Sequence, residues 1–382
     1  MNFEMNPEQQ AFSDSVRRFA QAELAPGAMA RAHSNKYPWD TAEKLAAQGL
    51  LGILVKEEDG GAGGTLMDAV IAIQEVAASC PKSADIVQAG NFGAIRTFAE
   101  YASAELRSRY LPDLLAGKAL MGLGMSEPEA GSAVTELRTS AKEDGDYYVI
   151  SGTKVFSTHS SDATAFLVYV RFGPGTEGIG SVIIDRDAPG LQIGRPSSFM
   201  SGEEWCQLYF DGCRVHKSNV LLGPGGFKKQ ISGFNVERIG NSSRALALGR
   251  YAFNIAKEHC SSRMQFGRPL CEFQGLQWKF ADMALQLESA QLLLYKAATG
   301  GDGGLPSAFD TTIAKLACNQ AGFNAANESM QAMGAYGFST EALVEYCVKR
   351  TRGWMIAGGS IEVLKNRVAE SIFERRFSQR KH

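Results

Sequence analysis

The 382-residue sequence contains few residues of the kinds that bind metal ions or form disulfides. Its five histidines are scattered, with no pair four residues apart, and its seven cysteines form no Cys-x-x-Cys motif. A metal enzyme built on histidine or cysteine ligands is therefore not expected. An odd number of dispersed cysteines is typical of reduced thiols, which favours a cytoplasmic protein over a disulfide-linked secreted one.

Charge excess and long apolar runs are also absent. Lys and Arg number 39 against 41 for Asp and Glu, and this net charge of −2 argues against nucleic acid as a partner. No apolar stretch approaches the roughly 20 residues of a membrane span, and residues 1–10 lack the basic and apolar parts of a signal peptide. Neither G-x-G-x-x-G after a strand nor G-x-x-x-x-G-K-[ST] occurs, so the two common glycine-rich phosphate loops are excluded.

What the sequence does contain is an excess of glycine, 41 residues, and three blocks of different periodicity. The first block predicts helices, beginning with the capping pattern of residues 6–9 and continuing at 41–48, 67–78 and 104–116. From about residue 120, short apolar runs separated by turn residues predict strands at 147–150, 154–156, 165–170, 181–184, 191–193 and 207–210. Beyond about residue 229 the helical period returns, with long helices at 281–298 and 311–333.

This order predicts three domains, at residues 1–119, 120–228 and 229–382. Short strands at such spacing form a small antiparallel barrel or a sandwich. The alternating strand–helix order of a dinucleotide-binding fold is absent, because helices and strands are segregated into separate blocks.

Two glycine-containing loops are candidates for close approach of the backbone to a ligand. Residues 60–64 follow the acidic turn Glu57–Asp59, a poor setting for a phosphate, and are expected to be a plain loop. Residues 126–132, Ser-Glu-Pro-Glu-Ala-Gly-Ser, combine small residues with a proline at the entrance to the strand block. This segment is either an ordinary turn or a place where amides point at a flat ligand, and the residues alone leave both open.

Five segments in the same order resemble the motifs of the acyl-CoA dehydrogenase family, and the resemblance covers nearly the whole chain. Residues 123–132 are similar to the first family signature, and residues 155–158, Val-Phe-Ser-Thr, resemble the flavin-facing strand that usually carries Trp-Ile-Thr. Residues 263–267 with Gln274 and residues 281–283 resemble the helix motif that contacts the dinucleotide. Residues 331–338 resemble the Q-x-x-G-G-x-G-F loop, and residues 356–360 the C-terminal segment that carries the catalytic base.

The resemblance implies an N-terminal helical domain, a central antiparallel β-barrel and a C-terminal four-helix bundle. It also implies noncovalent FAD, an acyl-CoA substrate, a homotetramer arranged as a dimer of dimers, and an electron-transfer flavoprotein as acceptor. The reaction it implies is α,β-desaturation of the acyl group to the 2-enoyl-CoA, with hydride passing to flavin N5. No metal, nucleic acid or membrane is expected.

The family pattern assigns cofactor contacts residue by residue. Backbone and hydroxyl groups of Met125, Ser126 and Thr158 would bond the isoalloxazine edge, and the ring of Phe156 would flank it. Arg263, Phe266 and Gln274 would reach the ADP half of a flavin in a neighbouring subunit. The remaining cofactor contacts implied are Leu123, Gly131, Ser132, Gln331, Ala335, Ser360 and Glu362. Taken singly, Phe156 is equally an ordinary core residue and Arg263 an ordinary surface residue.

The usual catalytic glutamate is missing from the C-terminal segment, where Gly358 occupies its position. Glu237, followed by Arg238, matches the isovaleryl-CoA and long-chain types, in which the base lies on an earlier helix and glycine stands at the C-terminal position. A Glu-Arg pair alone is also an ordinary surface feature; the coincident glycine favours a relocated base. Glu237 is thus expected to remove the α-proton, with a pKa raised by an apolar acyl pocket, while the Gly358 N–H bonds the thioester oxygen.

Substrate contacts are predicted at Ser132, Asn235 and Arg238, where Arg238 contacts the CoA side or orients Glu237. A base at this position leaves the other wall open, which favours a branched, cyclic or otherwise bulky acyl group. The absence of arginine from residues 85–92 argues against an acid group at the far end of the acyl chain, although Arg96 and Arg244 weaken that argument because either can reach inward.

Four positions depart from the family pattern: Ala133, Ala335, the pair Lys349-Arg350, and the segment 199–205. His159 is either a pocket residue or a structural one. Two other functions therefore stay open: a divergent relative with other flavin chemistry, desulfinating or oxygen-using, and an inactive subunit that binds FAD and acyl-CoA. Desulfinase-type relatives typically lack the carboxylate, so Glu237 speaks against the first.

Overall fold

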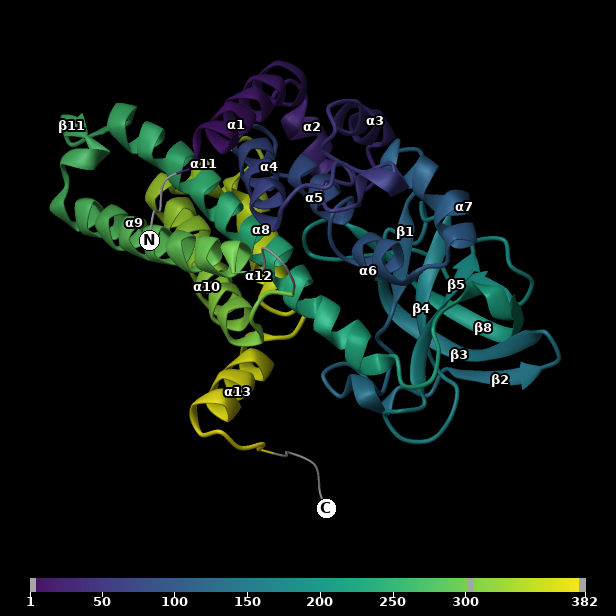
Figure 1. Cartoon of the computed structure of the whole chain (residues 1–382). Helices are drawn as coiled ribbons and strands as arrows, with labels where there is room; N and C mark the ends of the chain where they lie inside the picture. The colour runs from purple at the N-terminus through teal and green to yellow at the C-terminus, as the bar shows by residue number, and fades with distance from the viewer. Residues whose placement is uncertain (1–4, 301–304, 378–382) are drawn as a thin grey trace. The chain divides into compact units, whose positions relative to one another are not determined.

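The computed structural model describes residues 5–300 and 305–377 (Figure 1). The chain forms two compact units that interleave along the sequence. Unit 1 comprises residues 1–33, 65–88 and 235–382, and unit 2 comprises residues 34–64 and 89–234. The backbone therefore crosses between the units four times, and the three sequence domains proposed above stay a prediction.

Helices form the first third of the chain. Those at 41–48, 67–78 and 104–116 are confirmed within a few residues, and the helices Ala28–His33, Ser83–Ala89 and Ala94–Tyr101 were not predicted. Capping boxes begin two helices, with Asn6 and Gln9 at α1 and Thr65 and Asp68 at α4. The elements are α1 (Pro7–Phe19), a π-helical turn η1 (Ala20–Leu24), α2 (Ala28–His33), α3 (Trp39–Ala47), the 3₁₀ turn η2 (Glu57–Asp59), α4 (Leu66–Ser79), α5 (Ser83–Ala89), α6 (Ala94–Tyr101) and α7 (Ala104–Leu115).

The central block of unit 2 is a nine-stranded sheet with two further short 3₁₀ turns, η3 (Val134–Glu136) and η4 (Lys217–Asn219). Seven strands follow the order β6-β8-β3-β2-β4-β5-β9, while β1 pairs with β4 and β7 with β8. The strands are β1 (Met121–Gly124), β2 (Ser140–Asp144), β3 (Tyr147–Thr158), β4 (Ala165–Arg171), β5 (Ile179–Asp185), β6 (Leu191–Ile193), β7 (Ser197–Ser198), β8 (Glu204–His216) and β9 (Val220–Leu222).

The closed antiparallel barrel expected from the sequence is wrong in two details. The sheet is open, because its path ends at β6 and β9, and two of its pairings, β1 with β4 and β2 with β4, are parallel. The runs at 147–150 and 154–156 belong to one strand, β3, which is interrupted by register shifts against β8 between Ile150 and Gly152 and between Lys154 and Ser157. Strands β4 and β5 are buried nearly throughout, so both faces of the sheet are covered there.

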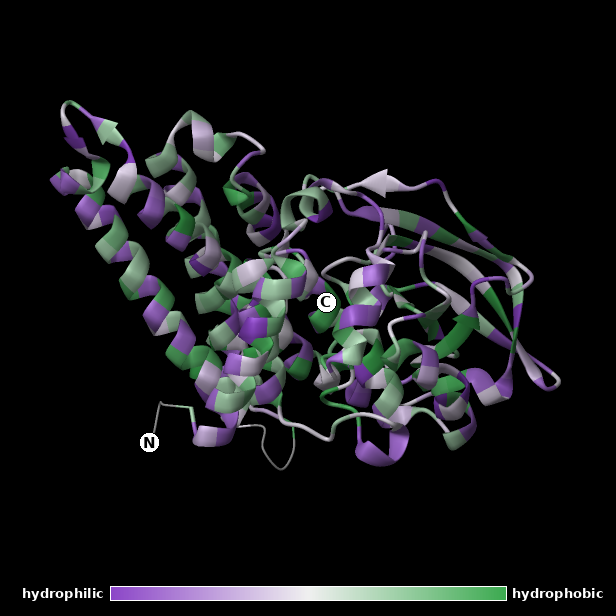
Figure 2. Cartoon of the chain, turned by 90° about the horizontal axis from the view of Figure 1, so that it is seen from above, coloured by the Kyte–Doolittle hydropathy of each residue, from purple (hydrophilic) through white to green (hydrophobic). Residues whose placement is uncertain are grey.

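Helices make up the C-terminal block, and both long helices expected there are confirmed. Helices α8 and α10 approach closely where Gly249 meets Gly322: a Cβ on Gly249 would lie 2.5 Å from the Gly322 Cα. Figure 2 shows hydrophilic and hydrophobic residues mixed along the helices of the chain. The elements are α8 (Phe227–Ser262), β10 (Met264–Gln265), β11 (Arg268–Pro269), the 3₁₀ turn η5 (Leu270–Glu272), α9 (Gln274–Thr299), α10 (Ala308–Met333), α11 (Ala335–Phe338), α12 (Val344–Trp354) and α13 (Ile361–Ile372).

Within the described residues, no helix has the length and apolarity needed to span a bilayer. All seven cysteines lie in this part of the chain and none forms a disulfide. Across residues 5–300 and 305–377, no cluster of three or more His, Cys, Asp or Glu side chains is arranged to hold a metal ion.

Candidate active site

Glu237 lies on α8 in unit 1, and a hydrogen-bonding neighbour comes from α5. The side-chain amide of Gln88 donates to Glu237 Oε1 over 2.7 Å, which holds the carboxylate in one orientation. Lys315 on α10 is a second polar neighbour, since the charge of Glu237 raises the lysine pKa. An amide and an ammonium group thus act on this carboxylate, and the apolar acyl pocket expected around it stays a prediction.

Gly358 lies in the loop between α12 and α13, and Lys315 holds this loop. The ammonium group donates to the carbonyl of Ala357 and, over 2.9 Å, to the carbonyl of Gly359, so it bonds both neighbours of Gly358. Gly358 has φ +69°, and a Cβ added there would lie 3.2 Å from Lys315 Nζ. The positive φ therefore favours glycine here, and the lysine beside it leaves little room for a side chain.

Lys315 is fully buried, and its pKa is lowered to about 7. Burial is the largest cause, the charges of Arg238 and Arg244 act in the same direction, and Glu237 opposes them. The residue thus links the two predicted catalytic positions, electrostatically to Glu237 and by hydrogen bonds to the backbone around Gly358.

Arg238 points away from Glu237 in its hydrogen bonding. Its Nη1 donates to Asn235 Oδ1 at 3.0 Å and to Thr312 Oγ1 at 3.3 Å, and burial lowers its pKa to about 10. Its Nε is buried and has no partner among the described residues. Of the two roles considered for Arg238, these contacts favour binding of a ligand acceptor over orienting the base.

In unit 2, a buried ion pair fixes the segment that the resemblance places at the flavin ring. Lys154 Nζ on β3 donates to Glu127 Oε1 at 2.7 Å and to the Met125 carbonyl at 3.2 Å. Glu127 also accepts from the backbone amides of Arg138 and Thr139. Burial lowers the Lys154 pKa to about 8 against the opposing charge of Glu127. Residues 123–127 are thus held rigidly along β3.

The same segment is bonded to β3 at two further points. Ser157 Oγ donates to the Leu123 carbonyl, and the Val155 amide donates to the Ser126 carbonyl, both at 2.9 Å. Leu123, Met125, Ser126 and Thr158 remain half-buried. These four predicted residues therefore lie at the C-terminal ends of β1 and β3, which the two bonds hold together.

Phe156 stands at the register shift in β3, with φ 56° and 57% of its surface exposed. A left-handed backbone costs a non-glycine residue about 1–3 kcal/mol, and such strain is concentrated at ligand sites. The ring lies 4.7 Å from Trp205 and 6.3 Å from Phe199, centroid to centroid. The divergent segment 199–205 thus supplies two aromatic rings beside the predicted flavin-flanking position.

The same segment also contacts His159. Glu203 Oε1 lies 3.5 Å from His159 Nε2, the His159 amide donates to the Glu204 carbonyl, and the ring of Tyr37 meets the imidazole edge-on at 5.4 Å. These contacts give His159 a structural role in holding segment 199–205.

Gly131 and Ser132 lie in an exposed bend after this segment. A Cβ built on Gly131 meets no atom within 4 Å, so the backbone borders open space. An exposed aromatic ring, half-buried polar groups and accessible backbone within one unit match the chemistry of a flat, hydrogen-bonding ring system such as flavin.

The residues predicted to reach the ADP half are exposed at the end of α8 and α9 in unit 1. Arg263 follows α8, Phe266 is 93% exposed with φ 50° in the turn between β10 and β11, and Gln274 begins α9. His259 on α8 stacks on Tyr336 at 5.5 Å, which ties this end to the 331–338 segment. Burial and the Arg263 charge lower the pKa of His259.

Gln331 and Ala335 are also exposed in this segment, and a Cβ on Gly334 meets nothing within 4 Å. The exposed arginine, aromatic ring and backbone match the groups that bind an adenosine diphosphate. Glycine occupies position 337 because of close packing, since a Cβ there would lie 2.7 Å from the Met333 Cβ.

Ser360 and Glu362 lie at the start of α13. Ser360 Oγ accepts from the Val363 amide and caps the helix, and Glu362 is in the first turn, where its own backbone amide and Ser360 lower its carboxyl pKa. Both side chains stabilise the N-terminal end of α13, which follows the loop that contains Gly358.

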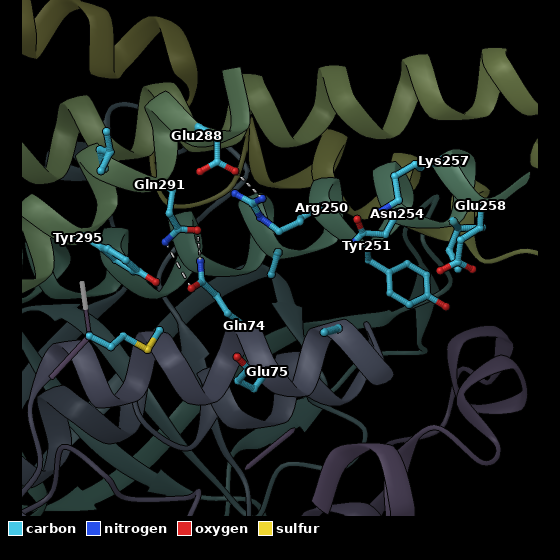
Figure 3. Close-up of a pocket in the computed structure, with 15 residues that line it drawn as sticks. Gln74, Glu75, Arg250, Tyr251, Asn254, Lys257, Glu258, Glu288, Gln291 and Tyr295 are labelled. Carbon is cyan, nitrogen blue, oxygen red and sulfur yellow. Dashed lines mark hydrogen bonds and ion pairs between the residues drawn. The ribbon is translucent and has the colours of Figure 1, made fainter. Parts of the chain in front are cut away.

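A pocket of about 730 Å³ opens between α4, α8 and α9 in unit 1 (Figure 3). Its walls include the amide pair Gln74–Gln291 and the ion pair Arg250–Glu288. None of the predicted catalytic or cofactor residues lines it. Arg250 lies 13 residues beyond Glu237 on α8, roughly 20 Å along the helix, so this pocket is separate from the base.

Sequence reasoning missed Gln88, Lys315, Lys154 and Trp205. Each lies far along the chain from the residue it supports: Gln88 is separated from Glu237 by 149 positions, and Lys315 from Ala357 by 42. The one local signal in the sequence was a lysine within a stretch of apolar or small residues, as at Lys154 and Lys315, because a buried lysine needs a polar partner.

Each of the three blocks of the chain matches one domain of a known protein family. The descriptions "Acyl-CoA dehydrogenase, N-terminal domain", "middle domain" and "C-terminal domain" match residues 6–118, 122–213 and 224–373. A protein of Paraburkholderia xenovorans named 3-sulfinopropanoyl-CoA desulfinase is 34% identical, covering 99% of both chains, and three more of that name are 33–34% identical. A short-chain-specific acyl-CoA dehydrogenase of Clostridium acetobutylicum is 32% identical over 98% of this chain and 100% of its own.

Solved structures agree. A glutaryl-CoA dehydrogenase in complex with glutaryl-CoA superposes with a TM-score of 0.93 at 28% identity, covering 100% of this chain and 99% of its own. A glutaryl-CoA dehydrogenase of Mycobacterium smegmatis in complex with FADH2 shares the fold, with a TM-score of 0.92 at 22% identity over 98% of this chain and 97% of its own. The chain therefore belongs to the acyl-CoA dehydrogenase family and is an oxidoreductase with FAD as its cofactor.

Proposed function

We propose that the protein desaturates an acyl-CoA thioester between the α and β carbons and that Glu237 removes the α-proton. The observation that carries this proposal is the shared environment of Glu237 and Gly358, both of which Lys315 engages. A carboxylate and a backbone N–H are the two groups that deprotonation next to a thioester requires.

In this mechanism each residue has one task. Glu237, oriented by Gln88, takes the proton on a carboxylate oxygen. The Gly358 N–H donates to the thioester oxygen, where negative charge develops, and Lys315 fixes that N–H by bonding the carbonyls on either side. FAD, when bound, supplies the acceptor for the β-hydride.

Cofactor binding is proposed at two places. Met125, Ser126, Thr158 and the ring of Phe156 hold the flavin ring, together with Leu123, Gly131 and Ser132. Arg263, Phe266, Gln274, Gln331 and Ala335 bind the ADP half in a neighbouring subunit of a homotetramer, and Ser360 and Glu362 complete the contacts. Asn235 and Arg238 contact the substrate. The exposure of the ADP-binding set in one chain supports its use by a second copy.

We also infer an electron-transfer flavoprotein as the acceptor of the electrons, and a cytoplasmic location, which the seven unpaired cysteines support. A branched, cyclic or bulky acyl group remains a prediction from the sequence. The polar side chains next to Glu237, Gln88 and Lys315, favour instead an acyl group that carries polar atoms.

Anaerobic mixing with a panel of acyl-CoAs tests the function, because a substrate bleaches the yellow flavin band. Glu237→Gln keeps an acceptor for Gln88 but removes the base, so bleaching should slow by about 10²- to 10⁴-fold while acyl-CoA binding is retained. Glu258→Gln, an exposed glutamate on the same helix, is the matched control and should bleach at the wild-type rate. Full-rate bleaching by Glu237→Gln would refute the assignment of the base.

Desulfination is a second candidate, because four relatives at 33–34% identity are named 3-sulfinopropanoyl-CoA desulfinase. The two functions differ in one measurement. Release of sulfite from 3-sulfinopropanoyl-CoA without lasting flavin bleaching would establish desulfination, and bleaching by sulfur-free acyl-CoAs would establish dehydrogenation.

A further inference from the structure

We propose that the acyl group of the substrate ends in an anionic acid group, carboxylate or sulfinate, which Arg244 and Arg350 bind at a buried cationic cluster around Asp85. This inference rests on the proposed function, because it takes Glu237 as the site of the α-carbon. It deepens that function by naming the substrate class.

The cluster is built around one carboxylate shared by two arginines. Arg244 Nη1 on α8 donates to Asp85 Oδ1 at 3.1 Å, and Arg350 Nη2 on α12 donates to Asp85 Oδ2 at 2.7 Å. Both guanidinium groups lie over the ring of Trp354, at 4.5 and 4.7 Å from its centroid. Asp85 and the indole thus fix two arginine side chains in one orientation.

A third basic residue, Lys82, lies near this cluster. Lys82 is 5% exposed and interacts electrostatically with both Asp85 and Arg350. The next carboxylate on α12, Glu345, does not neutralise these basic residues, since it pairs with Lys349 and His33. Buried basic groups of this kind are stabilised by an anion beside them.

Two buried donors in the cluster have no acceptor in the described part of the chain. Arg244 makes a single hydrogen bond, and its Nε is buried without a partner. The hydroxyl of Tyr346, a residue 2% exposed, is also buried without a partner, and it interacts electrostatically with Asp85 and Arg244. An acid group offers the acceptor oxygens that these donors lack.

The cluster lies on the same side of α8 as the proposed base. Glu237, Asn241 and Arg244 recur at i, i+4 and i+7, and therefore share one face of the helix. On α5, Gln88 and Asp85 are one turn apart, so the bonds Gln88–Glu237 and Asp85–Arg244 form two successive rungs between the helices. One to two helical turns separate the rungs, roughly 5–10 Å, the length of an acyl chain of about four to six carbons.

The side chains between the rungs are polar as well. Asn241 is buried and accepts from the Asn319 amide over 3.0 Å. A plain hydrocarbon chain placed here would leave the Arg244 and Tyr346 donors unsatisfied, whereas an acid-ended chain pairs them. Sites built from buried donors discriminate strongly against ligands that lack the matching acceptor.

The test measures binding to the Glu237→Gln holoenzyme by calorimetry under anaerobic conditions, because turnover in this variant is slowed about 10²- to 10⁴-fold. Glutaryl-CoA, 3-sulfinopropanoyl-CoA and neutral hexanoyl-CoA are the three probes. We expect at least one acid-ended probe to bind roughly 10- to 100-fold tighter than hexanoyl-CoA, and the preferred one identifies carboxylate or sulfinate as the group. Adding Arg244→Met should remove this preference and leave hexanoyl-CoA binding within about threefold, while Arg244→Lys should restore part of it.

Arg250→Met, an exposed arginine paired with Glu288 on the same helix, is the matched control and should change no affinity. Equal or tighter binding of hexanoyl-CoA by the unmodified site would overturn the inference, and this comparison needs no arginine variant to fold. Equal weakening of all three probes by Arg244→Met would overturn it too. The proposed function fails separately: it falls if no acyl-CoA bleaches the wild-type flavin, whereas bleaching by neutral acyl-CoAs alone overturns only the acid-group inference.

Discussion

Replacing Lys315 by methionine removes a buried ammonium group whose charged form the fold disfavours. In the folded chain the lysine pKa is about 7, and its ordinary value is 10.5. The unfolded chain therefore binds this proton more tightly, so the group opposes folding fully below pH 7, and the opposition fades as the pH rises toward 10.5. At 1.36 kcal/mol for each pH unit, the full cost is about 5 kcal/mol.

The measurable consequence is a change of stability with pH that the variant lacks. Between pH 6.5 and 8.5 the free energy of unfolding of the wild type should rise by about 2 kcal/mol relative to Lys315→Met. Lys315→Arg is the matched control, because an arginine stays charged in both states and also gives no such rise. Taking differences between proteins at each pH cancels the other titrating groups.

Urea unfolding followed by tryptophan fluorescence, at a fixed excess of FAD, gives these free energies. A wild-type minus Lys315→Met difference that stays constant within about 0.5 kcal/mol across this range would refute the reasoning. It would mean that the folded protein accommodates the charged ammonium group at little cost and that burial does not lower its pKa as described.

Other perturbations follow from contacts on either unit. Combining Glu237→Gly with Gly358→Glu should not restore flavin bleaching, because a side chain at φ +69° and 3.2 Å from Lys315 Nζ displaces the loop; wild-type bleaching by this variant would contradict it. Lys154→Met should lower the free energy of unfolding by about 3–5 kcal/mol in urea titration, since it leaves Glu127 buried and unpaired. Trp205→Ala should weaken FAD binding about 2- to 10-fold in a fluorescence titration, because it removes the ring packed against Phe156; unchanged FAD affinity would show that this aromatic cluster lies away from the flavin.

The helices and strands with clear periodicity were predictable from the sequence, and so was the helix–strand–helix order. The openness of the sheet was not, because β1 and β2 both pair with β4 in parallel, and no local pattern distinguishes such pairings from the antiparallel ones of a barrel. The long register-shifted β3 was read as two strands because its bulges interrupt the apolar alternation.

The catalytic positions Glu237 and Gly358 could be predicted together from the sequence. One carries the glutamate of a family motif, and the other carries glycine where the family usually has the catalytic glutamate. The side chains that surround these two residues could not be predicted, since they come from segments far apart in the sequence. Arg350 was visible as a departure from the family pattern, but its meaning comes from Asp85, 265 positions earlier. The lack of arginine in residues 85–92 was an argument against an acid group on the substrate. That argument no longer holds, because Arg244 on α8 reaches Asp85 in this stretch.

The interleaved path of the chain also determines when unit 1 can fold. Residues 65–88, which carry α4 and α5, leave the ribosome roughly 150 residues before α8 passes residue 235 and α9 and α10 follow. At synthesis rates of about 5–20 residues per second, α4 waits on the order of 10 s for the helices that cover its apolar residues. During that time Val70, Ile71 and Ile73, all fully buried in the finished fold, lack the helices α9 and α10, and the nascent chain exposes apolar surface of the kind that promotes aggregation.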